Sequence, residues 1–389
     1  MKLKNLRKNY RQVVDKTVFL RVDFNVVLSS GKLKEDFKIR QSLETINFLL
    51  KNKCRLVLAS HLGQPKNGFE SKYSLALVAK YLEKILDKKV IFFDYREFSK
   101  FSEIRKKILS GGDIFLLDNL RFYNGEERNC KRLAKSLASL ADVYVNDAFA
   151  VSHRANSSIS AIRSNMPSFM GLLLEKEILN LNKILHPKRP SVVVMGGAKI
   201  STKIPIIKKL YSKASYILLG GALINDFYLA QGFNIGKSLV DKDGIKLVKR
   251  FLNSKKIILP VDVVVRDESS LAKPIISIKK IAEISDNDRI LDIGPETILL
   301  FSQYIKKAQT IVWNGPLGMF EDEKFKKGTV IIAREIASRA SGRAFGVCGG
   351  GETVEALNSS GMSQYMDFVS TGGGAMLSYL AGEKMPGIN

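Results

Sequence analysis

The chain has 389 residues, of which 45% are hydrophobic and 26% charged, a composition typical of globular proteins with sizeable cores. The three cysteines lie far apart without metal-ligand spacing, which argues against a disulfide framework and a zinc site. No apolar run is long enough to span a membrane, and the N-terminus lacks the apolar segment of a secretory signal. We therefore expect a cytoplasmic protein, and its length favours two domains.

The formal net charge of +24 raises the alternative of a nucleic-acid-binding protein. The lysines are scattered, however, in pairs such as Lys106-Lys107, Lys208-Lys209 and Lys326-Lys327, and the sequence has no long basic tail. This pattern favours a lysine-rich solvated surface whose charge can steer anionic substrates. A steep salt dependence of oligonucleotide binding would instead support the alternative.

Short apolar runs in the first part of the chain alternate with longer amphipathic segments. Such alternation predicts a parallel sheet with helices on both faces, and we assign residues 1–165 to this domain. The predicted strands are Thr17–Val22, Arg55–Ala59, Val90–Phe93, Ile114–Leu117 and Val143–Val145.

Residues 166–190 are predicted to connect the two domains. Within them Phe169–Leu185 has helical periodicity, and the following His186-Pro187 is a stop signal for a helix. We expect a connecting helix and hinge.

Residues 191–374 repeat the alternation and form the second predicted domain. The fold class is therefore α/β, with two doubly wound, Rossmann-like parallel-sheet domains joined by a helical hinge. We expect the tail, residues 375–389, to pack back on the first domain. The predicted strands of the second domain are Val192–Met195, Tyr216–Leu219, Ile258–Val265, Ile290–Ile293, Ile311–Trp313 and Phe345–Cys348.

Three glycine runs end strand-like segments of the second half and precede helix-like stretches. They are Gly196-Gly197-Ala198-Lys199, the segment 349–353 (GGGET) and the segment 371–374 (TGGG). Loops of this kind expose backbone N–H groups at a helix N-terminus and bind phosphate. A single run could be an ordinary tight turn, but three runs with Lys199 and Lys203 nearby favour a nucleotide site. The sequence lacks the motifs of P-loop kinases and of Rossmann dehydrogenases.

Polar residues follow the predicted strands of the first half, where open α/β sheets bind their ligands. Two of the three histidines, His61 and His153, lie in these segments. Together with Arg21, Arg121 and Arg154 they predict a basic pocket for a small molecule that bears phosphate and carboxylate groups.

The chain resembles the phosphoglycerate kinase family from about Leu20 to its C-terminal segment. The motifs that carry the resemblance occur in family order. They are RVDFNV at 21–26, SHLG at 60–63, LRFYNGEE at 120–127, NDAF at 146–149 with HRA at 153–155, GGAKIS at 196–201, DIGPET at 292–297, WNGPLGMFE at 313–321, GGGET at 349–353 and STGGGA at 370–375.

The resemblance implies reversible phosphoryl transfer between 1,3-bisphosphoglycerate and ADP, which gives 3-phosphoglycerate and ATP and requires Mg²⁺. It implies one substrate in each domain and a monomer. The implied phosphoglycerate-binding residues are Arg21, Asp23, Asn25, Lys38, His61, Leu62, Gly63, Gln64, Arg121, His153 and Arg154. The implied nucleotide-binding residues are Lys199, Lys203, Gly220, Gly294, Asn314, Glu321, Gly350, Gly351, Glu352 and Thr353.

The resemblance also implies catalytic roles, because phosphoryl transfer depends on alignment and on neutralised charge. We expect Lys38 and Lys199 to stabilise the transferring group, and Gly350 and Gly373 to supply N–H donors. Glu352 is the expected Mg²⁺ carboxylate and Glu321 the expected ribose contact. Closure of the hinge would bring the two substrates together and exclude water.

The chain departs from the family pattern at several of these positions. Lys38 stands where the family has its catalytic arginine, and Arg40, two residues further along the expected helix, would point elsewhere. The other departures are Gln64, Asn156, Glu352 and Val27. Lys38, Gln64 and Asn156 keep open the alternative of a nucleotide-binding relative with weakened or lost catalysis.

Overall fold

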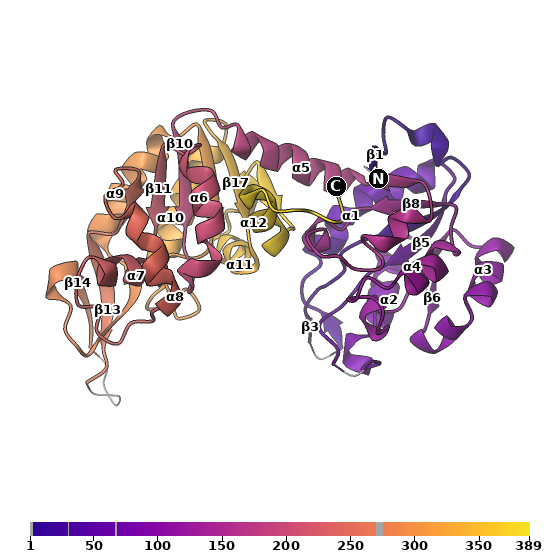
Figure 1. The fold of residues 1–389 in the computed structure, drawn as a ribbon, viewed down its shortest axis with the longest axis horizontal. Helices are drawn as coiled ribbons and strands as arrows, with labels where there is room; N and C mark the ends of the chain where they lie inside the picture. The colour runs from indigo at the N-terminus through magenta and orange to yellow at the C-terminus, as the bar shows by residue number, and fades with distance from the viewer. Residues whose placement is uncertain (1–2, 30, 67, 270–274) are drawn as a thin grey trace. The chain divides into compact units, whose positions relative to one another are not determined.

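The computed structural model describes residues 3–29, 31–66, 68–269 and 275–389, which divide into two compact units (Figure 1). The first unit contains the residues up to Leu179 together with Glu383–Asn389, and the second contains Asn180–Gly382. The division lies inside helix α5 (Leu172–Leu185) and not in a separate linker at 166–190. Helix α12 (Gly374–Ala381) belongs to the second unit, so a shorter tail than 375–389 returns to the first.

The first unit is built on a seven-stranded sheet in which every pair of neighbours is parallel. In sheet order the strands are β1 (Lys4–Asn5), β9 (Ser168–Met170), β8 (Val143–Asn146), β2 (Thr17–Arg21), β5 (Arg55–Ala59), β7 (Ile114–Leu117) and β6 (Val90–Phe93). A separate antiparallel pair consists of β3 (Leu28–Ser29) and β4 (Lys32–Leu33). The helices are α1 (Phe37–Lys51), α2 (Ala76–Leu86), α3 (Phe101–Ser110), α4 (Lys131–Ala138) and the first part of α5.

Both faces of this sheet are buried, which explains why its strands are continuous apolar runs. In β2, Val18 and Leu20 pack into one hydrophobic cluster, whereas the intervening Phe19 packs into a second cluster. Successive side chains of a strand point to opposite faces, so the two clusters lie on the two sides of the sheet. The arrangement leaves the carboxyl ends of the strands as the edge where polar residues gather.

The second unit contains a six-stranded sheet that is also parallel throughout. In sheet order its strands are β12 (Ile257–Ile258), β11 (Tyr216–Leu219), β10 (Ser191–Met195), β16 (Thr310–Asn314), β17 (Phe345–Gly349) and β18 (Phe368–Ser370). The helices are α6 (Ile204–Tyr211), α7 (Leu223–Ala230), α8 (Lys242–Val248), α9 (Pro295–Lys307), α10 (Lys327–Ala340), α11 (Gly351–Ser359) and α12.

A three-stranded antiparallel sheet in the second unit corrects part of the sequence prediction. Its order is β14 (Ile276–Lys280), β13 (Asp262–Asp267), β15 (Asp288–Ile293). The predicted strand Ile258–Val265 is two strands, β12 and β13, because Pro260 interrupts the run. The predicted strand Ile290–Ile293 lies in β15 and therefore not in a parallel sheet.

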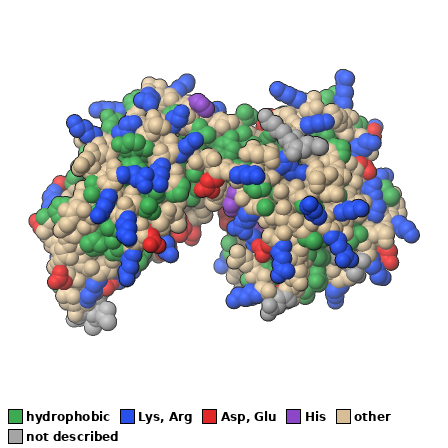
Figure 2. All heavy atoms as spheres, in the orientation of Figure 1, with side chains coloured by type: hydrophobic (Ala, Val, Ile, Leu, Met, Phe, Trp, Pro, Cys, Tyr) green, Lys and Arg blue, Asp and Glu red, His purple; other side chains and the backbone are tan. Residues whose placement is uncertain are grey.

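The predicted α/β fold class is confirmed, since both large sheets are parallel and carry helices. The predicted helix Phe169–Leu185 was too long at its start, because Ser168–Met170 pairs with β8 as strand β9. No helix within the described residues is long and apolar enough to cross a membrane. Lysine and arginine side chains are spread over the visible face in Figure 2 and do not gather in one patch.

Candidate active site

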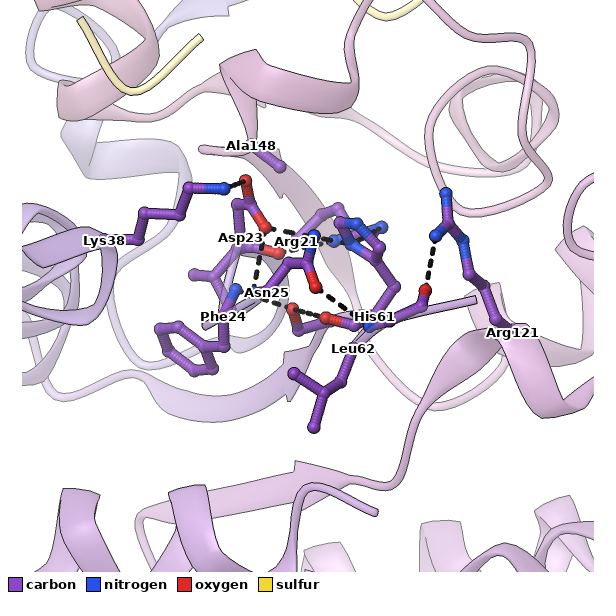
Figure 3. A network of polar contacts seen from close by, with 12 residues as sticks. Arg21, Asp23, Phe24, Asn25, Lys38, His61, Leu62, Arg121 and Ala148 are labelled. Carbon is purple, nitrogen blue, oxygen red and sulfur yellow. Dashed lines mark hydrogen bonds and ion pairs between the residues drawn. The ribbon is translucent and has the colours of Figure 1, made fainter. Parts of the chain in front are cut away.

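Lys38 and Asp23 form the central ion pair of the candidate site in the first unit (Figure 3). Lys38 lies in the first turn of α1, and its Nζ is 2.9 Å from Oδ2 of Asp23, which follows strand β2. Burial by itself would raise the pKa of Asp23, but the Lys38 ammonium group opposes this and the pKa lies below its usual value. The carboxylate therefore stays ionised and holds the lysine side chain toward the carboxyl edge of the sheet.

Arg40, two residues after Lys38 on α1, points to different partners. Its Nε is 2.6 Å from Oδ2 of Asp36, and its Nη2 is 3.1 Å from the hydroxyl of Tyr81 on α2. The same Asp36 oxygen accepts a hydrogen bond from Tyr81. Two residues on a helix differ in direction by about 200°, so only one of these cations can face Asp23. That residue is Lys38.

His61 lies beside Asp23 and is almost fully buried, at 4% exposure. Burial lowers its pKa well below the ordinary value, so the imidazole is neutral. Its Nδ1 lies 3.4 Å from Nη2 of Arg21. Arginine can only donate hydrogen bonds, so Nδ1 accepts and Nε2 carries the proton.

Arg21 differs from the expectation of a ligand-facing cation. It is 1% exposed, its Nε donates to Oγ of Ser158 at 2.9 Å, and its Nη1 donates to the Val22 carbonyl. Its guanidinium group is therefore committed to the protein interior beneath His61. The sequence could not show this, because Arg21 is the last residue of a central strand, a position of the kind at which ligand-binding residues are expected.

The SHLG loop is fixed by two other predicted residues. Asn25 Oδ1 accepts a hydrogen bond from the Gly63 N–H at 2.8 Å, and Arg121 Nη1 donates to the Gly63 carbonyl at 2.6 Å (Figure 3). Gly63 has a φ of +59°, and a β-carbon at this position would lie 2.3 Å from the Tyr73 ring. A glycine is therefore required here. Leu62 is buried, and its carbonyl accepts a bond from Asn119.

The remaining predicted residues of the first unit differ in accessibility. Arg154 and Gln64 are exposed, and Arg154 Nε lies 3.3 Å from Nε2 of the half-buried His153. Burial, followed by the charge of Arg154, lowers the pKa of His153. Asn156 is 4% exposed and hydrogen-bonds the buried Glu126, so it belongs to the support beneath the site.

In the second unit the glycine run that starts at Gly196 ends strand β10 and brings two backbones close together. A β-carbon on Gly196 would lie 1.8 Å from the Pro316 carbonyl oxygen, so no larger residue fits. Lys203, after this run, donates a hydrogen bond to Oδ1 of Asn314 at the end of β16. Burial lowers the pKa of Lys203, which the nearby Glu352 partly opposes. Lys199 is exposed, and its ammonium group has no hydrogen bond or ion pair with any described residue.

The other two glycine runs form helix N-termini, as predicted. Gly350 is the N-cap of α11, with Gly351 and Glu352 in its first turn, and Gly373 is the N-cap of α12. Neither cap is closed by a side-chain hydrogen bond. The free N–H groups and the helix dipoles are suited to an anion. Thr353 is 1% exposed and accepts a hydrogen bond from the Gly315 N–H at 2.7 Å, which gives it a structural contact.

A cavity of about 210 Å³ in the second unit is lined by Gly197 and Ala198 of the first glycine run and by Glu352 at the start of α11. The expected nucleotide residues Glu321 and Glu352 line it, together with residues that the sequence did not single out. Those additional residues are Gly221, Ala222, Ile224, Leu239, Arg289, Ile290 and Leu291, whereas the lining residues Gly197, Ala198 and Met319 lie in the motifs at 196–201 and 313–321. No sequence motif marks Leu239 or residues 289–291 of β15, although Asp292 of the same strand lies in the motif at 292–297 and also lines the cavity.

Gly294 and Gly220 are not among the residues that line this cavity. Gly294 caps α9, where its N–H donates to the Asp262 carbonyl at 2.9 Å and a β-carbon would meet the Asp262 carboxylate. Gly220 packs against Leu317, and its neighbour Gly221 is the residue at the cavity wall. Both predicted glycines therefore have a packing role in this structure.

A metal site made by protein groups alone is not present among residues 3–29, 31–66, 68–269 and 275–389, where no three His, Cys, Asp or Glu side chains converge. Glu352 is an exposed carboxylate that lines the same cavity as Gly197. A single carboxylate fits Mg²⁺, which retains waters and takes phosphate oxygens from its nucleotide. The residues present therefore suit a metal that arrives with the nucleotide.

Comparison with known proteins gives one consistent family. The family model described as "Phosphoglycerate kinase" matches residues 8–383. Phosphoglycerate kinase of Pseudothermotoga lettingae is 43% identical, with 96% of this chain and 95% of that protein covered. Phosphoglycerate kinase of Coprothermobacter proteolyticus is 41% identical, with 100% and 98% covered.

Solved structures agree with the sequence relatives. The structure of phosphoglycerate kinase from Coxiella burnetii has a TM-score of 0.82 and 36% identity, with 100% of this chain and 96% of that chain covered. The phosphoglycerate kinase from Pyrococcus horikoshii also has a TM-score of 0.82, with 31% identity and 99% and 97% covered. The chain belongs to the phosphoglycerate kinase family.

Proposed function

We propose that this protein is a phosphoglycerate kinase, which transfers a phosphoryl group reversibly between 1,3-bisphosphoglycerate and ADP to give 3-phosphoglycerate and ATP in glycolysis. The observation that carries the proposal is the cavity of the second unit, which is bordered by a glycine loop, Glu321 and Glu352. Membership of the phosphoglycerate kinase family supports a nucleotide as the ligand of this cavity. We further propose that the protein is a monomer, because one chain carries groups for both ligands. We also propose that it acts in the cytoplasm.

The nucleotide is proposed to bind in this cavity with its phosphates at the glycine loops. Lys203 and the N-termini of α11 and α12 supply positive charge there, and Glu321 is suited to accept hydrogen bonds from ribose hydroxyls. Mg²⁺, held through Glu352, would supply charge neutralisation for the phosphate oxygens.

Phosphoglycerate is proposed to bind in the first unit at the carboxyl ends of β2, β5, β7 and β8. Lys38, Arg121 and Arg154 offer cations for its phosphate and carboxylate groups. Neutral His61 donates from Nε2, while Asn25 and Gly63 hold the loop shape. Gln64 and His153 border the same segments.

The proposed chemistry needs little more than alignment and charge. The carboxylate oxygen of 3-phosphoglycerate attacks the γ-phosphorus of ATP, and the bond to the β-phosphate oxygen breaks to release ADP. Lys38 and Lys199 neutralise charge on the equatorial oxygens, and Gly350 and Gly373 N–H groups assist. The two ligands are assigned to separate units, so the transfer requires the units to bring them together and exclude water.

The alternative of a relative with lost catalysis is not favoured. Lys38 keeps a positive charge at the site, where it pairs with Asp23. The exposed Gln64 and the buried Asn156 do not remove any of the proposed ligand-binding cations. An assay of ADP formation from 3-phosphoglycerate and Mg-ATP tests the function directly. No turnover above the uncatalysed rate would refute it.

Calorimetry with each ligand separately tests the division of the two sites. Arg121→Ala and Arg154→Ala should weaken 3-phosphoglycerate binding and leave Mg-ADP binding intact. Equal loss of affinity for both ligands would contradict the assignment of one ligand to each unit.

A further inference from the structure

Two neighbours of His61 make opposite demands on the same ring nitrogen. Its Nδ1 lies 3.4 Å from Nη2 of Arg21 and 3.8 Å from Oδ1 of Asp23 (Figure 3). Arginine can only donate, so a bond from Arg21 requires an unprotonated Nδ1, whereas a bond to the Asp23 carboxylate requires a protonated one. The neutral ring has one N–H proton, so the neighbour that binds Nδ1 decides which nitrogen can donate to a ligand.

Asp23 is already bonded to other donors. Its Oδ2 accepts from Lys38 Nζ at 2.9 Å, and its Oδ1 accepts from the Asn25 N–H at 3.0 Å. The separation of 3.8 Å from His61 Nδ1 is too long for a hydrogen bond. Arg21 therefore determines the tautomer of His61 for as long as its guanidinium group stays in this position.

A buried chain of hydrogen bonds holds the Arg21 guanidinium group. Arg21 Nε donates to Ser158 Oγ at 2.9 Å, and the Ser158 hydroxyl donates to Glu126 Oε1 at 2.5 Å. Ser158 and Glu126 are both fully buried. A hydroxyl group has one proton, so a Ser158 hydroxyl that donates to Glu126 presents its lone pairs to Arg21. The chain therefore runs in one direction, from the arginine to the carboxylate.

Ser158 is itself held on two further sides. Its N–H donates to Glu126 Oε2 at 3.0 Å, and its carbonyl accepts from the Tyr144 hydroxyl at 2.8 Å. Burial raises the pKa of Glu126, but the charge of Arg21 and the Ser158 donors oppose this effect. A buried guanidinium group needs a counter-charge, which the Glu126 carboxylate supplies through Ser158.

We propose that Ser158 and Glu126 are positioning residues for phosphoglycerate binding. They hold Arg21, and Arg21 holds His61 in the tautomer whose Nε2–H can donate to a carboxylate or phosphate oxygen. This inference rests on the proposed function, which assigns 3-phosphoglycerate to His61. Glu126 lies in the motif at 120–127, whereas Ser158 lies outside every motif that carries the family resemblance.

The ¹⁵N NMR signals of the His61 ring in the full chain without ligand measure the tautomer directly. The chain has three histidines, and the signals that disappear in His61→Gln are those of His61. We expect the Nε2–H form in the unaltered protein. Ser158→Ala leaves Arg21 Nε without its acceptor, so the guanidinium group moves and Asp23 becomes the acceptor for a protonated Nδ1. The Nδ1–H form should then predominate.

Calorimetry measures the consequence for ligand binding. Ser158→Ala should raise the Kd for 3-phosphoglycerate about tenfold, which corresponds to the loss of one hydrogen bond to a charged group. The Kd for Mg-ADP, which is assigned to the other unit, should change by less than about twofold. If Ser158→Ala fails to fold, Ser158→Cys replaces the hydroxyl by a weak donor and acceptor and should shift the tautomer in the same direction.

Ser157→Ala is the matched control, because Ser157 is the preceding residue and is equally buried. Among the described residues, its hydroxyl bonds to the carbonyl oxygens of Gly125 and Cys130 and not to the Glu126 carboxylate. The substitution removes a buried hydroxyl group but leaves the chain that holds Arg21 intact. Ser157→Ala should therefore keep the Nε2–H form, with a Kd for 3-phosphoglycerate within about twofold of the unaltered protein.

Retention of the Nε2–H form or of the Kd for 3-phosphoglycerate in Ser158→Ala, or equal changes in Ser157→Ala, would overturn the inference. Phosphoryl transfer from Mg-ATP to 3-phosphoglycerate by the unaltered protein is measured in parallel. Transfer combined with an unchanged tautomer leaves the proposed function standing. Absence of transfer refutes the proposed function, whereas the tautomer, measured without ligand, still decides whether Ser158 positions His61.

Discussion

At the scale of single residues, the site of the first unit depends on which cation faces the reacting groups. Asp23 anchors Lys38, and Asp36 with Tyr81 anchors Arg40 on another side of α1. The ammonium group of lysine is a point charge without the planar fork of arginine. Lys38 can therefore neutralise a transferring phosphoryl group, although it orients that group less rigidly.

Replacement of Lys38 tests this assignment. We expect Lys38→Met to lower kcat about 100-fold or more, because one preorganised charge typically contributes ~3 kcal/mol to the transition state. Lys38→Arg should preserve or raise kcat, since it restores the bidentate fork. Steady-state kinetics with saturating 3-phosphoglycerate and Mg-ATP measures both effects.

Arg40→Met is the matched control, because it removes a cation from the same helix without touching Asp23. Its kcat should stay within about threefold of the unaltered enzyme, a change of less than ~1 kcal/mol. Full activity of Lys38→Met combined with inactive Arg40→Met would mean that Arg40 has the catalytic role.

The two lysines after Gly196 should differ in their kinetic effects. Lys203 is half-buried and held by Asn314, so Lys203→Ala should mainly raise KM for the nucleotide. Lys199 is exposed and uncommitted among the described residues, so Lys199→Ala should mainly lower kcat. Unchanged kinetic constants in both variants would remove these lysines from the proposed site.

Sequence reasoning found the residue types but not their burial. The helical spacing of Lys38 and Arg40 was sufficient to predict that only one of them faces the site. Arg21 and Gly294 could not be judged in this way, because a strand-end arginine or a loop glycine looks the same whether it contacts a ligand or supports the fold. The difference arises from packing partners such as Ser158 and Asp262, which are distant in sequence.

At the scale of elements, the parallel strands and glycine runs were predictable because each has a local signature. The cavity wall formed by β15 was not. Strand β15 pairs with β13 in an antiparallel sheet that brings Arg289–Leu291 to the cavity, and no local pattern specifies such a long-range pairing. Short strands such as β9 were missed because they resemble the start of the following helix.

Helices α7 and α8 are linked through the carboxyl group of Asp226, which lies near the carboxylate of Asp241. Asp226 in α7 is fully buried, and its Oδ1 accepts a hydrogen bond from the N–H of Asp241, the N-cap of α8, at 2.9 Å. Burial raises the pKa of Asp226 to about 6, and the charge of Asp241 adds to the effect. The Asp241 carboxylate in turn accepts from the Ser201 N–H, close to Lys199.

This raised pKa predicts a pH dependence of stability. The folded protein keeps the proton up to about pH 6, whereas an unfolded aspartate loses it near pH 4, so the Asp226 contribution to stability falls as pH rises through this interval. Between pH 5 and pH 7 the free energy of unfolding should fall by about 1 kcal/mol more in the unaltered protein than in Asp226→Asn.

Urea unfolding at the two pH values measures this difference. Asp243→Asn, which removes an exposed carboxylate from the same helix α8, is the control and should keep the pH dependence of the unaltered protein. Identical pH dependence in Asp226→Asn and the unaltered protein would show that Asp226 titrates normally.

At the scale of the whole molecule, the chain crosses between the two units twice. After α12 it returns to the first unit, where the tail is drawn in yellow in Figure 1. The Gly387 carbonyl accepts from Asn146 Nδ2 and its N–H donates to the Ser152 carbonyl, both at 2.9 Å. Arg163 donates to the Pro386 carbonyl at 2.6 Å. These bonds fasten the segment that follows β8.

Removal of residues 383–389 should therefore affect the first unit selectively. Loss of buried hydrogen bonds typically costs about 1–3 kcal/mol per unsatisfied group. We therefore expect weaker binding of 3-phosphoglycerate and faster proteolytic cleavage within the residues up to Leu179. Mg-ADP binding should be retained. As a control, a chain that ends at Ile388 keeps the hydrogen bonds of Pro386 and Gly387 and should behave as the full protein. If the longer deletion lowered the affinity for 3-phosphoglycerate and for Mg-ADP equally, the expectation would be contradicted.

The returning tail also orders the events of biosynthesis. Translation proceeds from the N-terminus, yet the partners of Asn146, Ser152 and Arg163 are Pro386 and Gly387, which follow the whole second unit in the sequence. These contacts can form only after the entire second unit has been synthesised and Pro386 and Gly387 have left the ribosome. The part of the enzyme that is translated first is thus completed last, and a nascent chain stalled before Pro386 carries an unfinished phosphoglycerate-binding unit.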